Sequence, residues 1–110
     1  MLKIKGKTIT LTKGDTLLVK IDVKANNEEY IPSEDDEIRF ALKSSYSDPE
    51  VLIYKVIPND TLELYIPSEE TKQLEVRSTP YVYDIQLTTA SGIVDTFIDR
   101  GSFYVTEEVE

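Results

Sequence analysis

Hydrophobic and polar residues alternate along much of this chain, which is the pattern of half-buried β-strands. The alternation is clearest over residues 81–87, whose polar face lies opposite an apolar face of Tyr81, Tyr83, Ile85 and Leu87. A Thr-Thr-Ala-Ser-Gly turn and a second apolar segment at residues 93–98 follow, so this region predicts a β-hairpin. Residues 17–24 show the same period, with an apolar face of Leu17, Val19, Ile21 and Val23.

Other short segments also have strand character, and they are found at residues 2–5, 8–12, 38–43, 51–57, 61–66 and 102–106. The turn Pro58-Asn59-Asp60 predicts a second antiparallel hairpin, formed by residues 51–57 and 61–66. The period of two breaks at residues 68–74, where Ser68 is a candidate N-cap and two glutamates favour the helix dipole. About one to two helical turns are therefore expected there.

The spacing of these segments predicts an all-β fold. Seven to nine short strands, with turns about every eight to twelve residues and one short helical turn, are typical of an antiparallel β-sandwich. An immunoglobulin-like topology is favoured because Tyr81 follows the helical turn as a tyrosine corner would, although the usual Asp-x-Gly-x-Tyr spacing is absent. The alternative is that Tyr81 or Tyr83 is simply a core aromatic. A chain of 110 residues predicts a single domain, residues 1–110.

The charge balance limits the classes of partner. Twelve basic and twenty-one acidic residues give a net charge of −9, which disfavours nucleic acid and anionic membrane surfaces. The first residues alternate apolar with basic, so no signal peptide is expected, and no apolar run has the length of a transmembrane segment. The chain starts basic, with Lys3, Lys5 and Lys7, and ends acidic. These lysines either contact an acidic neighbour or protect an edge strand.

The residue types offer little chemistry. Histidine and cysteine are absent, which removes the usual general base and any thiolate ligand or disulfide, so we expect no enzymatic activity and no cofactor. Hard oxygen ligands for calcium are available at Glu34, Asp35, Asp36 and Asp48, but the Asp-x-Asp-x-Asp-Gly loop pattern is missing. A solvated turn is the simpler interpretation, and we predict no metal site.

Tyrosines are the strongest hint of a binding surface. The chain has seven, and tyrosine supplies rigid contact area with a polar tip. The candidates for protein contact lie opposite the more apolar faces of their strands: Tyr54, Tyr65 and Tyr104. The alternative is that tyrosine is simply a favoured strand residue.

Several segments occur in a characteristic order: Gly14-Asp15-Thr16, Tyr30-Ile31-Pro32, Ile38-Arg39-Phe40, Ser68-Glu69-Glu70-Thr71, Tyr81 to Leu87, and Gly92 to Thr96. In this order the chain resembles small structural proteins of tailed phages and prophages, including the immunoglobulin-like N-terminal domains of baseplate upper proteins. The resemblance implies a non-enzymatic tail or baseplate subunit, made in the bacterial cytoplasm and carried in the virion. Its partners would be other phage structural proteins or copies of itself, as a homo-oligomer.

A second hypothesis keeps the sandwich but changes the partner. The domain would be a ligand-binding module for carbohydrate or a cell surface, using the loop residues Tyr30 and Tyr46, with calcium bound by residues 34–37. Tryptophan, a favoured stacking platform for sugars, is absent, which counts against this hypothesis.

Overall fold

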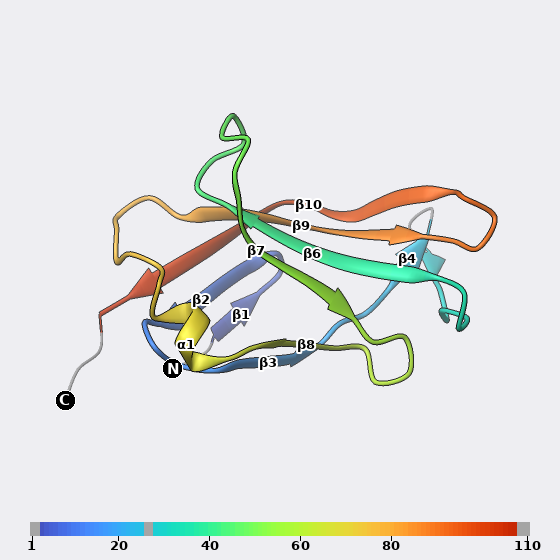
Figure 1. The fold of residues 1–110 in the computed structure, drawn as a ribbon, viewed down its shortest axis with the longest axis horizontal. Coiled ribbons are helices and arrows are strands. Elements are labelled where there is room, and N and C mark those ends of the chain that lie inside the picture. The colour runs from blue at the N-terminus through green and yellow to red at the C-terminus, as the bar shows by residue number, and fades with distance from the viewer. Residues whose placement is uncertain (1–2, 26–27, 108–110) are drawn as a thin grey trace.

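Two β layers enclose the hydrophobic core in the computed structural model, which describes residues 3–25 and 28–107 (Figure 1). The larger layer has the strand order β1-β2-β10-β9-β6-β7. Its strands are β1 (Lys3–Lys5), β2 (Thr8–Thr12), β6 (Glu37–Lys43), β7 (Val51–Ile57), β9 (Tyr81–Thr88) and β10 (Val94–Thr106). The smaller layer pairs β3 (Leu17–Lys20) with β8 (Glu63–Ile66). A separate short pair joins β4 (Lys24–Ala25) and β5 (Glu28–Glu29), and the helix α1 spans Ser68–Thr71.

The all-β sandwich is confirmed, with two differences: the described residues form ten strands where seven to nine were expected, and one pair of strands is parallel. The pairs are antiparallel except that β10 runs parallel to β2, from Ser102 opposite Thr8 to Thr106 opposite Thr12. The chain leaves the large sheet after β2, crosses to β3, and returns for β6 and β7 before β10 inserts between β2 and β9. This long excursion allows parallel neighbours, which a short hairpin turn cannot join.

The predicted alternation places the core correctly. The apolar face of β9 is buried at every second position, and β6 buries Ile38, Phe40 and Leu42 completely. The smaller layer closes over them with Leu17, Leu64 and Ile66, which are also fully buried. Burying an aliphatic or aromatic side chain of this size contributes about 1.5–3 kcal/mol, so the contact between layers stabilises the fold without a disulfide.

The predicted hairpin of residues 51–57 and 61–66 is wrong. β7 pairs with β6 in the large sheet, whereas β8 pairs with β3 in the small one. The turn between them is closed by a hydrogen bond of 2.8 Å from the Leu62 amide to the Pro58 carbonyl, and Leu62 has φ of 56°. This left-handed residue redirects the chain from one layer to the other, so the two segments cannot share a ladder.

The helical segment has the predicted length of about one turn, but Ser68 is not its N-cap. α1 ends at Thr71, and its N-cap is Pro67, with no side-chain capping bond. The Ser68 hydroxyl instead donates a hydrogen bond of 2.6 Å to the Gly14 carbonyl, and the Thr71 hydroxyl donates one of 2.8 Å to the Asp15 carbonyl. The two side chains therefore fix α1 to the turn before β3.

Tyr81 forms the bond that a tyrosine corner requires. The backbone amide of Glu75, six residues before Tyr81, donates a hydrogen bond of 2.8 Å to the Tyr81 phenol oxygen. The ring is buried, and the Arg77 guanidinium lies 3.8 Å from its centroid. Tyr81 is thus both a core aromatic and a tether for the segment after α1.

Candidate interaction surface on strand β7

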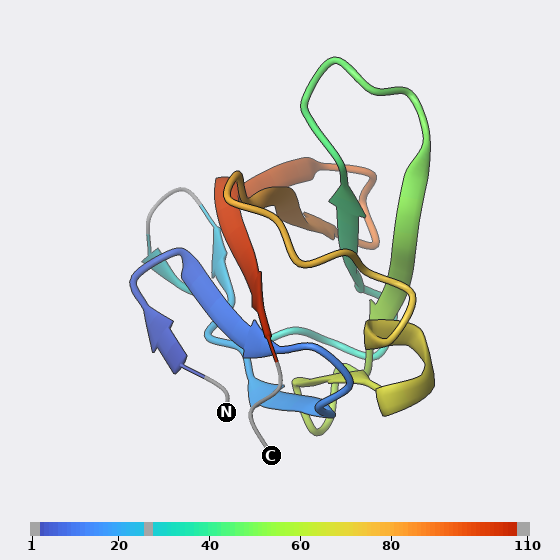
Figure 2. The same cartoon turned by 90° about the vertical axis from the view of Figure 1, so that its left-hand side faces the viewer.

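One edge of the large sheet is open. β7 is the last strand in the order, and β6 is the only strand that hydrogen-bonds to it in residues 3–25 and 28–107. Figure 2 shows β7 at the right-hand boundary of the molecule, with no strand beyond it. In an antiparallel pair, alternate backbone N–H and C=O groups point away from the neighbour. The outer side of β7 therefore presents backbone groups that an additional strand can pair with.

The side chains of β7 are apolar on its exposed face as well. Val51, Leu52, Tyr54 and Val56 are 43%, 41%, 52% and 59% exposed, whereas Ile53 and Ile57 are buried in the core. Apolar residues scattered singly on a surface are ordinary, but here four of the seven residues of one edge strand are both apolar and exposed. We name these four residues the β7 stripe.

The charge on this strand is paired. The Lys55 ammonium lies 2.5 Å from a carboxylate oxygen of Glu70 in α1, and both side chains are partly exposed. An edge lysine commonly repels a second strand, but this ion pair neutralises its charge. The edge is therefore long, apolar and without a free cation on β7.

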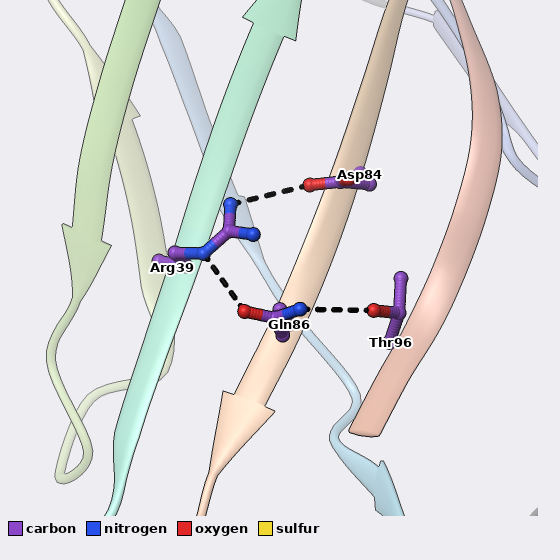
Figure 3. Close-up of polar contacts among 4 residues, drawn as sticks. All are labelled: Arg39, Asp84, Gln86 and Thr96. Atoms are coloured by element: carbon purple, nitrogen blue, oxygen red, sulfur yellow. Dashed lines mark hydrogen bonds and ion pairs between the residues drawn. The ribbon is translucent and has the colours of Figure 1, made fainter. Parts of the chain in front are cut away.

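Polar side chains cover the outer sheet face next to the β7 stripe (Figure 3). Arg39 on β6 donates from Nε to the Gln86 amide oxygen at 3.0 Å and lies 3.4 Å from an Asp84 carboxylate oxygen. The Gln86 amide donates onward to the Thr96 hydroxyl at 3.1 Å. These residues bridge β6, β9 and β10, and they satisfy one another, so this polar ladder marks the inner limit of the apolar surface.

The three tyrosines predicted for protein contact do not form one surface. Tyr54 and Tyr104 lie on the large sheet, but β6 and β9 separate their strands. Tyr65 lies on β8 in the other layer, opposite Leu18 of β3, and both side chains are 54% exposed. Tyr54 alone belongs to the β7 stripe.

The basic start of the chain forms the other edge of the large sheet. Lys3 and Lys5 lie in β1, and their side chains fall outside the described part of the structure. Lys7 follows in the turn, is exposed, and its carbonyl accepts a hydrogen bond of 2.9 Å from the Tyr83 hydroxyl. The interpretation that these lysines protect an edge strand stays a prediction.

Asp36, one of the candidate calcium ligands, has a structural role. Its carboxylate accepts hydrogen bonds from the Tyr30 hydroxyl at 2.5 Å, the Ser33 amide at 3.0 Å and the Ala90 amide at 3.0 Å. The Tyr30 bond, followed by the Ser33 bond, lowers the pKa of Asp36, and the same carboxylate raises the pKa of Tyr30. Asp36 therefore joins the loop before β6 to the turn after β9.

The remaining acidic candidates are not gathered into a site. Glu34 and Asp35 are exposed, and an Asp48 carboxylate oxygen accepts a bond of 2.9 Å from the Glu50 amide within its own loop. No group of three or more acidic residues able to hold a metal occurs in the described residues. Tyr30 and Tyr46, proposed as a ligand surface, lie beyond opposite ends of β6, so the fold does not bring them together.

Sequence reasoning missed most of the β7 stripe. It selected Tyr54 but not Val51, Leu52 or Val56. A signal was present, because residues 51–57 read Val-Leu-Ile-Tyr-Lys-Val-Ile and do not alternate with polar residues. A continuous apolar strand normally indicates burial on both faces. Here one of those faces has no cover in the described chain.

Comparisons with known proteins add no assignment: no protein-family model matches the chain, and no curated protein is similar to it. Among the described residues there is no helix with the length and hydrophobicity needed to cross a membrane.

Proposed function

We propose that this chain is a non-enzymatic structural subunit that acts through protein–protein contacts, with β7 as its contact edge. The single observation that carries the proposal is the long, apolar and unpaired β7 edge. The resemblance of the sequence to phage and prophage structural proteins supplies the setting, a tail or baseplate module. An all-β domain of this kind contributes shape and contact surface to an assembly.

Strand addition is the contact that the geometry favours. A partner strand along β7 would satisfy its outward backbone groups and cover the β7 stripe at the same time. A cavity of about 340 Å³ lies beside the first half of this edge, and Leu52, Ile53, Leu74 and Glu75 are among its lining residues. It offers space for side chains of an added strand.

A second copy of the chain is the partner that suits the β7 sequence. If two β7 strands pair antiparallel with Tyr54 at the twofold axis, Leu52 of one copy lies opposite Val56 of the other. Tyr54 then faces Tyr54, so the apolar residues of both stripes form one cluster. The Lys55 residues lie opposite Ile53, and Glu70 compensates each charge. The strand is therefore complementary to itself, as a twofold interface requires.

The test is native mass by light scattering over a range of protein concentrations. We expect a concentration-dependent dimer in the unchanged protein and a monomer in Val56→Lys, because lysine places an unpaired charge in the apolar cluster. Ile93→Lys is the matched control: Ile93 is 64% exposed in the turn between β9 and β10, so this variant should still dimerise. A strict monomer at all concentrations, or equal dimerisation of both variants, would contradict pairing through β7.

A further inference from the structure

Three connecting segments gather at one end of the sandwich. They are residues 30–37, which lead into β6, residues 58–62, between β7 and β8, and residues 88–95, around the turn from β9 to β10. Figure 1 shows them on the right, at the end of the long axis away from α1. Loops on a rigid scaffold commonly carry the contacts that a domain makes. We name these three segments the loop end.

Side-chain hydrogen bonds fix the three segments to one another. The Asp36 carboxylate accepts a bond of 3.0 Å from the Ala90 amide, which joins the first segment to the third. The Asn59 side-chain amide donates to the carbonyl oxygens of Ser33 at 2.8 Å and Asp36 at 2.6 Å, which joins the second segment to the first. Because these bonds order the loop end in the free chain, binding of a partner there costs less conformational entropy.

The loop end presents large apolar side chains to solvent. Ile31 is 92% exposed, the highest value among the exposed large apolar residues of the described chain, and Pro32 restricts its backbone. Ile93 is 64% exposed in the turn between β9 and β10, and Val94 beside it is also exposed. One exposed isoleucine is ordinary, but several such side chains on segments that are bonded together favour contact with another molecule.

The loop end is acidic and has no base of its own. None of the chain's twelve basic residues falls within its three segments. Four of its acidic side chains are exposed: Glu34, Asp35, Glu37 and Asp60. The neighbouring bases have other partners, since Arg39 contacts Gln86 and Asp84, and Lys24 lies opposite Glu29. This surplus of negative charge repels nucleic acid, anionic lipid and a second loop end, and it attracts a basic protein surface.

We propose that the loop end docks a protein surface that carries basic residues around an apolar pocket. Ile31 and Ile93 would enter the apolar part, and the exposed acids would pair with the basic rim. Burial of the isoleucines supplies most of the affinity, and the acids select the sign of the partner's charge. This contact is separate from the β7 edge and does not depend on the proposed function.

The experiment uses a synthetic amphipathic peptide of leucine and lysine as the probe. It is titrated into the full chain and followed by two-dimensional amide NMR, and we expect saturable shifts in residues 30–37, 58–62 and 88–95. Two peptides of the same length separate the contributions. A leucine–glutamate peptide should not bind, and a serine–lysine peptide, which keeps the charge and lacks the apolar side chains, should bind about tenfold more weakly.

Substitutions in the loop end test its residues. Ile31→Ser should weaken binding of the leucine–lysine peptide about fivefold, and Glu34→Lys with Asp35→Lys should weaken it about tenfold. Glu69→Lys with Glu107→Lys is the matched control. It makes the same change in net charge at two exposed glutamates, one in α1 and one beside Lys72, and it should leave binding unchanged. Circular dichroism checks that each variant is folded.

Two further variants separate this contact from the β7 edge. Ile93→Lys should weaken peptide binding, whereas Val56→Lys, which changes only the β7 stripe, should leave peptide binding unchanged. The proposal is overturned if the leucine–lysine peptide does not saturate, if either control peptide binds equally well, or if Ile31→Ser or the double reversal leaves binding unchanged. Sedimentation of the chain with phosphatidylcholine vesicles that is lost in Ile31→Ser would also overturn it, because the loop end would then contact lipid.

Discussion

The two edges of the large sheet both expose unpaired backbone groups, but their strands differ in length and in side chains. β1 has three residues, Lys-Ile-Lys, whereas β7 has seven, of which four exposed side chains are apolar. Short length and lysine are standard means of preventing a second strand from pairing. We therefore expect β1 to resist pairing with a second strand and β7 to permit it.

The largest effect that this difference between the two edges predicts is a disulfide between two copies of the chain, joined across their β7 strands. The chain has no cysteine, so Tyr54→Cys creates a single thiol at the expected twofold axis. Directly opposite residues have Cβ atoms about 4.5–5.5 Å apart, close to the separation that a disulfide spans. We expect mild oxidation to convert most of this variant to a covalent dimer on a non-reducing gel.

Tyr65→Cys is the matched control, because Tyr65 is 54% exposed and Tyr54 is 52% exposed. Tyr65 lies on the other layer, where no pairing is proposed, so its thiol should cross-link slowly. Equal cross-linking of the two variants would count against a specific β7 contact.

Removing the charge from β1 should make the two edges alike. In the Val56→Lys background, where β7 pairing is lost, Lys3→Val with Lys5→Val is expected to produce a new concentration-dependent association through β1. Sedimentation velocity measures it. Lys3→Arg with Lys5→Arg keeps the charge and should remain monomeric. If the valine variant is also monomeric, length rather than lysine blocks this edge.

Gly101 lies on β10 in the middle of the large sheet, and of the glycines it has the least room for a side chain. A Cβ added at Gly101 would lie 2.4 Å from two ring atoms of Tyr83, its cross-strand partner. Gly101→Ala is therefore expected to destabilise the fold by about 1–3 kcal/mol, measured by urea unfolding. Ser102→Ala, one residue along, is the control. Unchanged stability of Gly101→Ala would mean that the Tyr83 ring moves aside freely.

A smaller loss of stability is expected from a substitution of Tyr83, which is bonded to the turn between β1 and β2. Tyr83→Phe removes the hydrogen bond to the Lys7 carbonyl, which should lower stability by about 0.5–1.5 kcal/mol at neutral pH. Burial raises the pKa of Tyr83 to about 12, above the value of about 10 for an unfolded tyrosine. The folded state thus favours the neutral phenol, a contribution that is complete below pH 10 and is lost between pH 10 and 12.

Urea unfolding of both proteins from pH 8 to pH 12 tests this sign. The unchanged protein should lose stability across the upper part of the range, and Tyr83→Phe should lose less. Parallel curves for the two proteins would mean that Tyr83 has the same pKa in the folded and unfolded states, which would contradict the shift caused by burial.

Local patterns in the sequence predicted the core but not the edges. The alternation at residues 81–87 and 38–43 identified buried faces, because side-chain period depends on neighbouring residues alone. Strand order depends on distant pairings. The residues at Pro58 predicted a hairpin turn. The strand pairing shows instead that β7 and β8 belong to different layers, and Leu62, with its left-handed backbone, lies between them.

The residues of the candidate interaction surface could not be predicted from local patterns either. Tyr54, Tyr65 and Tyr104 looked equivalent in sequence, since each occupies the outward position of a strand. The fold gives them different neighbours: an open edge for Tyr54, the outer face of the small layer for Tyr65, and an inner strand for Tyr104. Which tyrosine can meet a partner strand is decided by the strand order.

Hydrogen exchange by mass spectrometry at several protein concentrations tests the β7 contact most directly. Pairing of β7 with a second copy should slow amide exchange in residues 51–57 as concentration rises, while exchange in residues 3–5 stays constant. Val56→Lys should remove this dependence on concentration. Exchange in residues 51–57 that is independent of concentration, or protection that appears at β1 instead, would contradict the assignment of β7 as the contact edge.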